Sequence, residues 1–173
     1  MSNLLAARVT LTLDGPFTFV VTRDAVVAAG WGEDAAVTLA HMTGYQPCDR
    51  AQARVAQQAI EAVEAYYSGD YSLIMDVPVK QPGSEFRQRV WRELRGVAAG
   101  STITYGGLAA LAGRPAAARA VGSTMACNAV PLFVPCHRVV RSDGSIGQFA
   151  FGPALKASLL EREHATLSEA PTK

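Results

Sequence analysis

Residues 134–140, Val134-Pro135-Cys136-His137-Arg138-Val139-Val140, place a thiol beside an imidazole between apolar, strand-forming residues. A cysteine attacks as its thiolate, and a neighbouring His or Arg lowers the pKa of the thiol, so we expect a pKa below that of free cysteine. Pro135 restricts the backbone before the sulfur, which predicts a stiff turn holding Cys136 in one orientation. A buried structural cysteine between two strands fits the same residues. The pattern alone leaves both interpretations open.

The stretch Pro135–Val139 resembles the active-site signature of the O6-alkylguanine-DNA alkyltransferases, also called methylated-DNA–protein-cysteine methyltransferases. The resemblance runs from about Phe86 to Glu163. It implies an α+β protein, with a small N-terminal α/β domain that is ribonuclease H-like. A mainly helical C-terminal domain follows, with a helix-turn-helix and an active-site cysteine loop. The domains are expected at residues 1–83 and 84–168, with a tail at 169–173.

Length and composition are those of a globular protein. The 173 residues are 49% hydrophobic and 18% charged, which allows a sizeable core. No apolar run is long enough to span a bilayer, and the N-terminus lacks the pattern of a signal peptide. Cys48, Cys127 and Cys136 cannot all pair, and their spacing predicts no zinc site. We therefore expect a cytoplasmic protein without a metal, associated with the nucleoid when it binds DNA.

Charge is distributed unevenly along the chain. Residues 1–83 carry five basic and nine acidic residues, a net charge of −4, whereas residues 84–173 carry eleven and six, a net charge of +5. Most of these basic residues are Arg, which binds phosphate bidentately and stacks on bases. The second half is therefore predicted to bind a polyanion. An ordinary surface of mixed charge remains the alternative.

Strand patterns dominate the first half, which shows no chemical motif. Alternating apolar residues and helical spacing are the signals used. They predict strands at 8–13, 17–21, 25–31 and 72–77, turns at 14–16 and 81–83, a loop at 33–50, and a helix at 51–67. Cys48 and His41 are interpreted as incidental.

Helix patterns dominate the second half. Ser84 is the expected N-cap of a helix over 84–97, and Thr104 that of a short helix over 105–111. A further helix over 116–127 would complete a helix-turn-helix, although any helical bundle contains such pairs. The remaining predicted elements are a hairpin at 139–146 with a turn at Asp143-Gly144, a pocket loop at 147–152, and a last helix beginning at Pro153.

The helix over 116–127 consists mostly of small residues around Arg119. A helix that reads the major groove carries several long polar side chains, and this one has a single long cation. The composition predicts contact through backbone and shape, with Arg119 inserted into the DNA. A buried Ala-rich helix with one surface Arg is the alternative.

Specific residue roles follow from the family resemblance. It implies Cys136 as alkyl acceptor, His137 as the base that takes the thiol proton through a water, Glu163 as the residue that orients His137, and Tyr105 as a hydroxyl donor to the flipped guanine. The implied DNA contacts are Thr104, Ala118, Arg119, Gly122 and Ser123, with Arg119 filling the space of the flipped base. The implied substrate pocket comprises Asn128, which is also a hinge, and Pro131, Val139, Phe149, Ala150 and Phe151.

The implied activity is direct-reversal repair, a single irreversible transfer of the alkyl group to Cys136 without a cofactor. The implied partner is double-stranded DNA containing O6-alkylguanine, bound through the minor groove by a monomer; cooperative binding stays open. The chain departs from the family at Gln148-Phe149-Ala150-Phe151-Gly152, where Gly-Tyr-x-Gly-Gly is usual. A ring at Phe151 is predicted to exclude benzyl-sized groups.

Two other functions fit parts of the sequence. A binding-only relative would recognise lesions and recruit other repair proteins, but such relatives lack the cysteine, and Cys136 is present. A helix-turn-helix regulator could use Cys136 as a redox sensor, but the acidic first half offers no obvious dimer interface or effector domain.

Overall fold

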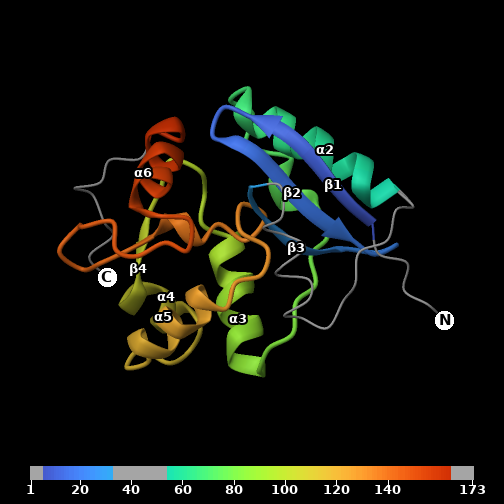
Figure 1. Ribbon diagram of the computed structural model, residues 1–173. Coiled ribbons are helices and arrows are strands. Elements are labelled where there is room, and N and C mark those ends of the chain that lie inside the picture. The colour runs from blue at the N-terminus through green and yellow to red at the C-terminus, as the bar shows by residue number, and fades with distance from the viewer. Residues whose placement is uncertain (1–5, 33–53, 165–173) are drawn as a thin grey trace. The chain divides into compact units, whose positions relative to one another are not determined.

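The computed structural model describes residues 6–32 and 54–164, which form an α+β fold in two compact units (Figure 1). The first unit contains Met1–Pro82 and Ala129–Phe133, and the second contains Gly83–Asn128 and Val134–Lys173. The short segment 129–133 thus interrupts the second unit just before the Cys136 stretch. No sequence pattern predicts this interruption.

The first unit is built on an antiparallel sheet of order β1-β2-β3. Its strands are β1 (Ala6–Thr12), β2 (Gly15–Val21) and β3 (Val26–Trp31). The pairing of Thr12 with Gly15 leaves residues 13–14 as the turn, so the predicted turn at 14–16 is displaced. Gly15 begins β2 with φ +99°, a conformation that glycine adopts without steric cost.

Helix α2 (Arg54–Tyr67) packs against β1 and β3 and confirms the predicted helix within the described residues. The predicted strand at 72–77 is wrong, because the chain forms a short 3-10 helix, η1 (Ile74–Asp76). Ile74 and Val77 are both buried, and their spacing of three suits a helical turn rather than a strand. The loop expected at 33–50 lies outside the described residues.

Segment 129–133 belongs to the core of the first unit. The backbone N–H of Ala29 in β3 donates to the carbonyl of Ala129 at 2.8 Å. The Phe133 ring lies 6.0 Å from that of Phe17 and 6.3 Å from that of Phe19, measured between centroids. These aromatic contacts bury the segment within the first unit.

In the second unit, helix α3 (Glu85–Arg95) begins as predicted. The Ser84 side chain accepts a hydrogen bond from the N–H of Arg87 and so caps the helix. Val90, Trp91 and Leu94 form its buried stripe. The helix ends two residues earlier than predicted, since Gly96 forms the C-cap.

Helices α4 (Tyr105–Leu111) and α5 (Ala118–Ala126) pack against each other and against α3. The predicted cap of α4 is confirmed, with Thr104 Oγ1 accepting from the N–H of Gly107 at 2.9 Å. Helix α5 begins two residues later than predicted. Residues 115–116 form a turn, and the N-cap Ala117 has no side chain that can cap the helix.

A short parallel pairing joins β4 (Ile103–Thr104) to β5 (Val139–Val140). The predicted hairpin at 139–146 is therefore reduced to a turn, in which the N–H of Arg141 donates to the carbonyl of Ser145 at 2.9 Å. Helix α6 (Pro153–Arg162) follows the loop at 147–152 and begins at the predicted proline. Among the described residues, no helix is long and apolar enough to cross a membrane.

Candidate active site

Cys136 is the first residue of η2 (Cys136–Arg138), a short 3-10 helix directly after Pro135. Its backbone N–H donates to the carbonyl of Val134 at 2.8 Å. The side-chain amide of Asn128 donates to the same carbonyl at 2.9 Å. These two bonds fix the backbone leading into Cys136, which is 9% exposed. The predicted stiff turn is thus present.

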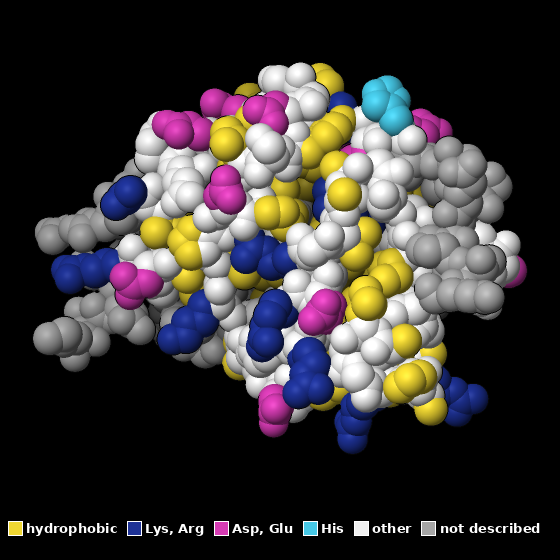
Figure 2. All heavy atoms as spheres, turned by 180° about the vertical axis from the view of Figure 1, so that it is seen from behind, with side chains coloured by type: hydrophobic (Ala, Val, Ile, Leu, Met, Phe, Trp, Pro, Cys, Tyr) yellow, Lys and Arg dark blue, Asp and Glu magenta, His cyan; other side chains and the backbone are white. Residues whose placement is uncertain are grey.

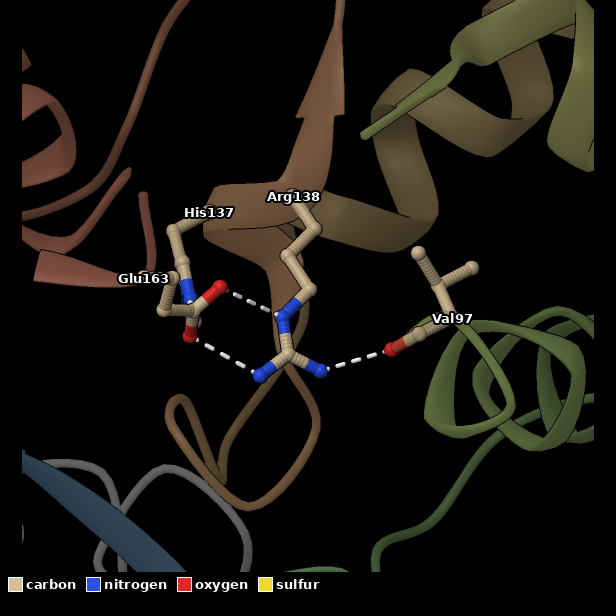
Figure 3. A network of polar contacts seen from close by, with 4 residues as sticks. All are labelled: Val97, His137, Arg138 and Glu163. Atoms are coloured by element: carbon tan, nitrogen blue, oxygen red, sulfur yellow. Dashed lines mark hydrogen bonds and ion pairs between the residues drawn. The ribbon is translucent and has the colours of Figure 1, made fainter. Parts of the chain in front are cut away.

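Three buried side chains form a polar network next to Cys136 (Figure 3). Glu163 lies just after α6 and accepts from both His137 and Arg138. His137 Nε2 is 2.8 Å from Glu163 Oε1. Arg138 donates through Nε to Oε2 at 2.9 Å and through Nη2 to Oε1 at 2.8 Å. Arg138 Nη1 donates to the carbonyl of Val97 at 2.7 Å, which ties the network to the end of α3.

The charges of this network determine the state of the imidazole. Burial would raise the pKa of Glu163, but hydrogen bonds and charges from His137 and Arg138 outweigh it and hold that pKa well below its usual range. Burial lowers the pKa of His137 despite Glu163, so the imidazole is neutral at pH 7. Because an ionised carboxylate only accepts, Nε2 carries the imidazole hydrogen and Nδ1 keeps its lone pair. Nδ1 is buried and has no hydrogen-bond partner among the described residues.

The expected acidification of Cys136 is wrong in direction. Burial raises the pKa of the Cys136 thiol, although a hydrogen bond from Asn128 and the charge of Lys156 oppose the shift. His137 is neutral and adds no positive charge, while Arg138 is paired with Glu163. His137 and Arg138 therefore do not provide the positive charge that was expected to lower the pKa of Cys136.

Lys156 and Arg138 are two buried cations that the sequence analysis did not assign. Lys156 Nζ donates to the carbonyl of Val139 at 2.6 Å and to that of Gln148 at 3.2 Å. Helical spacing gives the signal that could have found Lys156, since it shares a face of α6 with Leu159 and Leu160. For Arg138, the signal was its place between His137 and two buried valines.

Tyr105 is brought to the site by the pairing of β4 with β5, because it directly follows β4. Burial raises the pKa of Tyr105, and the charge of Cys136 adds to the shift, so the hydroxyl stays protonated. A Cβ added to Gly147 would lie 3.2 Å from this hydroxyl. The loop at 147–152 therefore runs close to Tyr105. Within it, the rings of Phe149 and Phe151 meet edge to face at 5.9 Å.

The other predicted site residues fall into separate groups. On α5, Arg119 and Ser123 are exposed, whereas Ala118 and Gly122 are half-buried. Ala150 is exposed and Val139 buried, on the loop and on β5. The hydroxyl oxygen of Thr104 accepts the hydrogen bond that caps α4. Pro131 belongs to the first unit. In the described ranges, no cluster of His, Cys, Asp or Glu could hold a metal ion.

Comparison with known proteins places this geometry in a family. Residues 85–165 match the model of the 6-O-methylguanine DNA methyltransferase DNA-binding domain. The methylated-DNA–protein-cysteine methyltransferase of Mycolicibacterium paratuberculosis is 39% identical over 112 residues, which are 64% of this chain and 67% of that protein. The chain belongs to the methylated-DNA–protein-cysteine methyltransferase family. The match covers Cys136, His137 and Glu163.

Other members of this methyltransferase family agree. The mouse methylated-DNA–protein-cysteine methyltransferase is 54% identical over 87 residues, which are 50% of this chain. The aligned part of the chain spans only 41% of the mouse protein's length. The crystal structure of Mycobacterium tuberculosis OGT in complex with DNA superposes with a TM-score of 0.78 and 31% identity, covering 96% of this chain and 95% of that one. The α+β fold is therefore that of a solved relative.

Proposed function

We propose that this protein repairs DNA by direct reversal, moving the alkyl group of O6-alkylguanine to Cys136. The observation that carries the proposal is the buried thiol next to a neutral His137 whose Nδ1 lone pair has no hydrogen-bond partner among the described residues. A buried polar atom without a partner is costly, and a bridging water would satisfy it. The names of the family's curated members support the same activity.

The proposed reaction is one nucleophilic displacement. The Cys136 proton passes through a water to His137 Nδ1, and Glu163 stabilises the resulting imidazolium. The sulfur forms a bond to the alkyl carbon while the bond from that carbon to O6 breaks, and its electron pair stays on the guanine. The Tyr105 hydroxyl donates a hydrogen bond to the departing base. The thioether is stable, so each molecule acts once.

For DNA binding we infer that α4 and α5 form a helix-turn-helix that docks in the minor groove. Gly122 supports this placement, because a Cβ there would meet no described atom within 4 Å apart from the backbone of its own helix. The protein's own packing therefore does not require a glycine in the middle of α5, whereas close approach by another molecule would. On the face that Figure 2 presents, Lys and Arg side chains lie among acidic and apolar ones. Relatives of known structure include one in complex with DNA.

Arg119 is proposed to fill the space of the extruded base, with contacts from Thr104, Ala118 and Ser123. Replacing Arg119 by Ala should slow transfer from duplex DNA, because extrusion costs a few kcal/mol that an inserted side chain partly offsets. Transfer from the free base should be nearly unchanged. Equal losses on both substrates, measured as second-order rates, would assign Arg119 to the fold instead.

The remaining assignments are architectural. We infer that the first unit is a structural ribonuclease H-like domain, since its antiparallel sheet carries α2 beside it and gains a parallel bridge from Val26 to Val79. Asn128, Val139, Phe149, Ala150 and Phe151 are proposed as residues of the substrate pocket. We expect the protein to bind DNA as a monomer.

Intact-mass spectrometry after incubation with O6-methylguanine DNA tests the proposal. The protein should gain about 14 Da, the mass of a methyl group replacing a hydrogen, and peptide mapping should place it on Cys136. Cys136→Ser should gain nothing. A binding-only relative would retain the DNA without a mass change. A redox-sensing regulator would show neither methyl gain nor preference for the lesion, and either result would overturn the proposal.

A further inference from the structure

Lys156 is a buried cation whose partners do not account for its charge. It is 1% exposed and lies on the inward face of α6. Its ammonium donates to two backbone carbonyls, those of Val139 in β5 and Gln148 in the following loop. In the described part of the chain, no carboxylate lies within ion-pair distance of it. Burying an ammonium is costly unless an anion compensates it.

The ionisable groups that act on Lys156 leave one candidate for that anion. The positive charge of Arg141 disfavours the protonated form of Lys156, whereas a Cys136 thiolate favours it. The charge of Lys156 also acts on His137, whose imidazole is neutral and supplies no negative charge. Glu163 is already paired with His137 and Arg138. The thiolate of Cys136 is thus the only anion in this group that Lys156 can compensate.

We propose that Lys156 is a positioning residue of the transfer reaction, with its ammonium serving as the counter-charge of the Cys136 thiolate while it fastens Gln148 to β5. This inference rests on the proposed function and deepens it. The thiol is buried and carries no charge at rest, so the thiolate must be stabilised when the proton leaves. A fixed cation in a site of low dielectric supplies that stabilisation without rearrangement.

The second part of the role follows from the two carbonyls. Lys156 links β5, which ends the Cys136 stretch, to the loop at 147–152. That loop also runs beside the Tyr105 hydroxyl at Gly147. A side chain that holds both walls therefore keeps the thiol and the hydroxyl in register.

The test separates charge from hydrogen bonding with three variants of the full-length protein. Lys156→Met keeps the length and removes charge and donor, Lys156→Gln keeps a donor, and Lys156→Arg keeps the charge. All are made with Cys48→Ser and Cys127→Ser, so that only Cys136 reports. The readout is the rate of alkylation by iodoacetamide as a function of pH, without DNA. Thermal unfolding checks that each variant is folded.

We expect Lys156→Met and Lys156→Gln to raise the apparent pKa of Cys136 by about one unit or more, which slows alkylation at pH 7 about tenfold. Lys156→Arg should stay within about threefold of the parent. If the Met variant does not fold, the Gln and Arg variants still decide. Alkylation by the Gln variant at the parent's rate would overturn the counter-charge, since the hydrogen bonds alone would then suffice.

A second arm measures methyl transfer from O6-methylguanine DNA for the same proteins. The rates should fall in parallel with the alkylation rates. Absence of methyl transfer in the parent itself would refute the proposed function, whereas the iodoacetamide profiles would still decide the role of Lys156. A fall in methyl transfer with unchanged alkylation profiles would refute the counter-charge and leave the loop contact.

Discussion

Arg138 holds Glu163 as an anion at the centre of the site. It occupies both carboxylate oxygens, while His137 shares one of them. The positive charge of Arg138 compensates the negative charge of Glu163. The carboxylate can therefore orient His137 while the imidazole stays neutral. Arg138 is therefore the residue on which the geometry of the relay depends.

Replacing Arg138 by Met should destabilise the protein by about 3–5 kcal/mol, since it leaves a buried carboxylate without its main partner. Chemical denaturation of the variant and of the parent measures the difference. Arg138→Lys, which keeps a charge but loses the fork geometry, should lose less. A loss below about 1 kcal/mol for the Met variant would mean that His137 alone holds Glu163.

The residues of the site differ in how far the sequence predicts them. The family resemblance paired His137 with Glu163, and the structure has that hydrogen bond. Arg138 and Lys156 were missed because long cations are usually assigned to the surface, and only tertiary packing shows that these two are buried. The error on the pKa of Cys136 has the same origin. Neighbours in sequence suggest charge, but burial determines which charges reach the sulfur.

Helix α5 carries a glycine that its own packing does not require. Gly122→Ala should stabilise the protein by about 0.5–1 kcal/mol, because glycine inside a helix loses more backbone entropy than alanine. Apart from the backbone of its own helix, a Cβ there meets no described atom within 4 Å, so no steric clash offsets this gain. The same methyl group should weaken binding to duplex DNA if α5 approaches the DNA closely. Thermal unfolding and fluorescence anisotropy measure the two effects, and unchanged DNA affinity would place this face of α5 away from the DNA.

We expect the loop at 147–152 to decide which alkyl groups are accepted. Phe151 packs edge to face on Phe149, so its ring adds bulk to the loop where glycine is usual in the family. We expect Phe151→Gly to speed transfer from benzylguanine far more than transfer from methylguanine, because only the larger group meets the ring. Parallel mass-spectrometric time courses compare the substrates. Slower benzyl transfer in the variant would instead show that Phe151 stacks on the benzyl group, a contact worth about 0.5–1.5 kcal/mol.

At the scale of elements, the sequence predicted those with local signals. Ser84 and Thr104 mark their helices because their side chains cap exposed N–H groups, and the structure has both caps. The strand predicted at 72–77 was wrong because the spacing of three between Ile74 and Val77 indicates a helical turn only once both side chains are known to be buried. The placement of segment 129–133 in the first unit rests on contacts between distant residues, such as Phe133 with Phe17, which no local pattern encodes.

For the whole molecule, the free energy of unfolding should depend on pH because Lys156 is buried. Burial lowers the pKa of Lys156 from 10.5 to about 8, although the negative charge of Cys136 acts to raise it. Between these two pH values the unfolded chain binds a proton that the folded chain does not. The free energy of unfolding therefore rises with pH through this window. At neutral pH the folded protein therefore keeps Lys156 charged at a cost in stability.

Unfolding of Cys136→Ser and of Cys136→Ser/Lys156→Met, compared between pH 7 and 10.5, measures this contribution. Because the thiol is removed from both proteins, Lys156 is the titrating group by which they differ. Tyr67, whose pKa is raised to about 12, is present in both and does not contribute to the difference between them. We expect the single variant to gain on the order of 3 kcal/mol relative to the double variant as the pH rises. At pH 7 the double variant should be the more stable, because Met removes a buried charge. Parallel pH profiles for the two proteins would show that Lys156 titrates normally, and would contradict its burial as a cation.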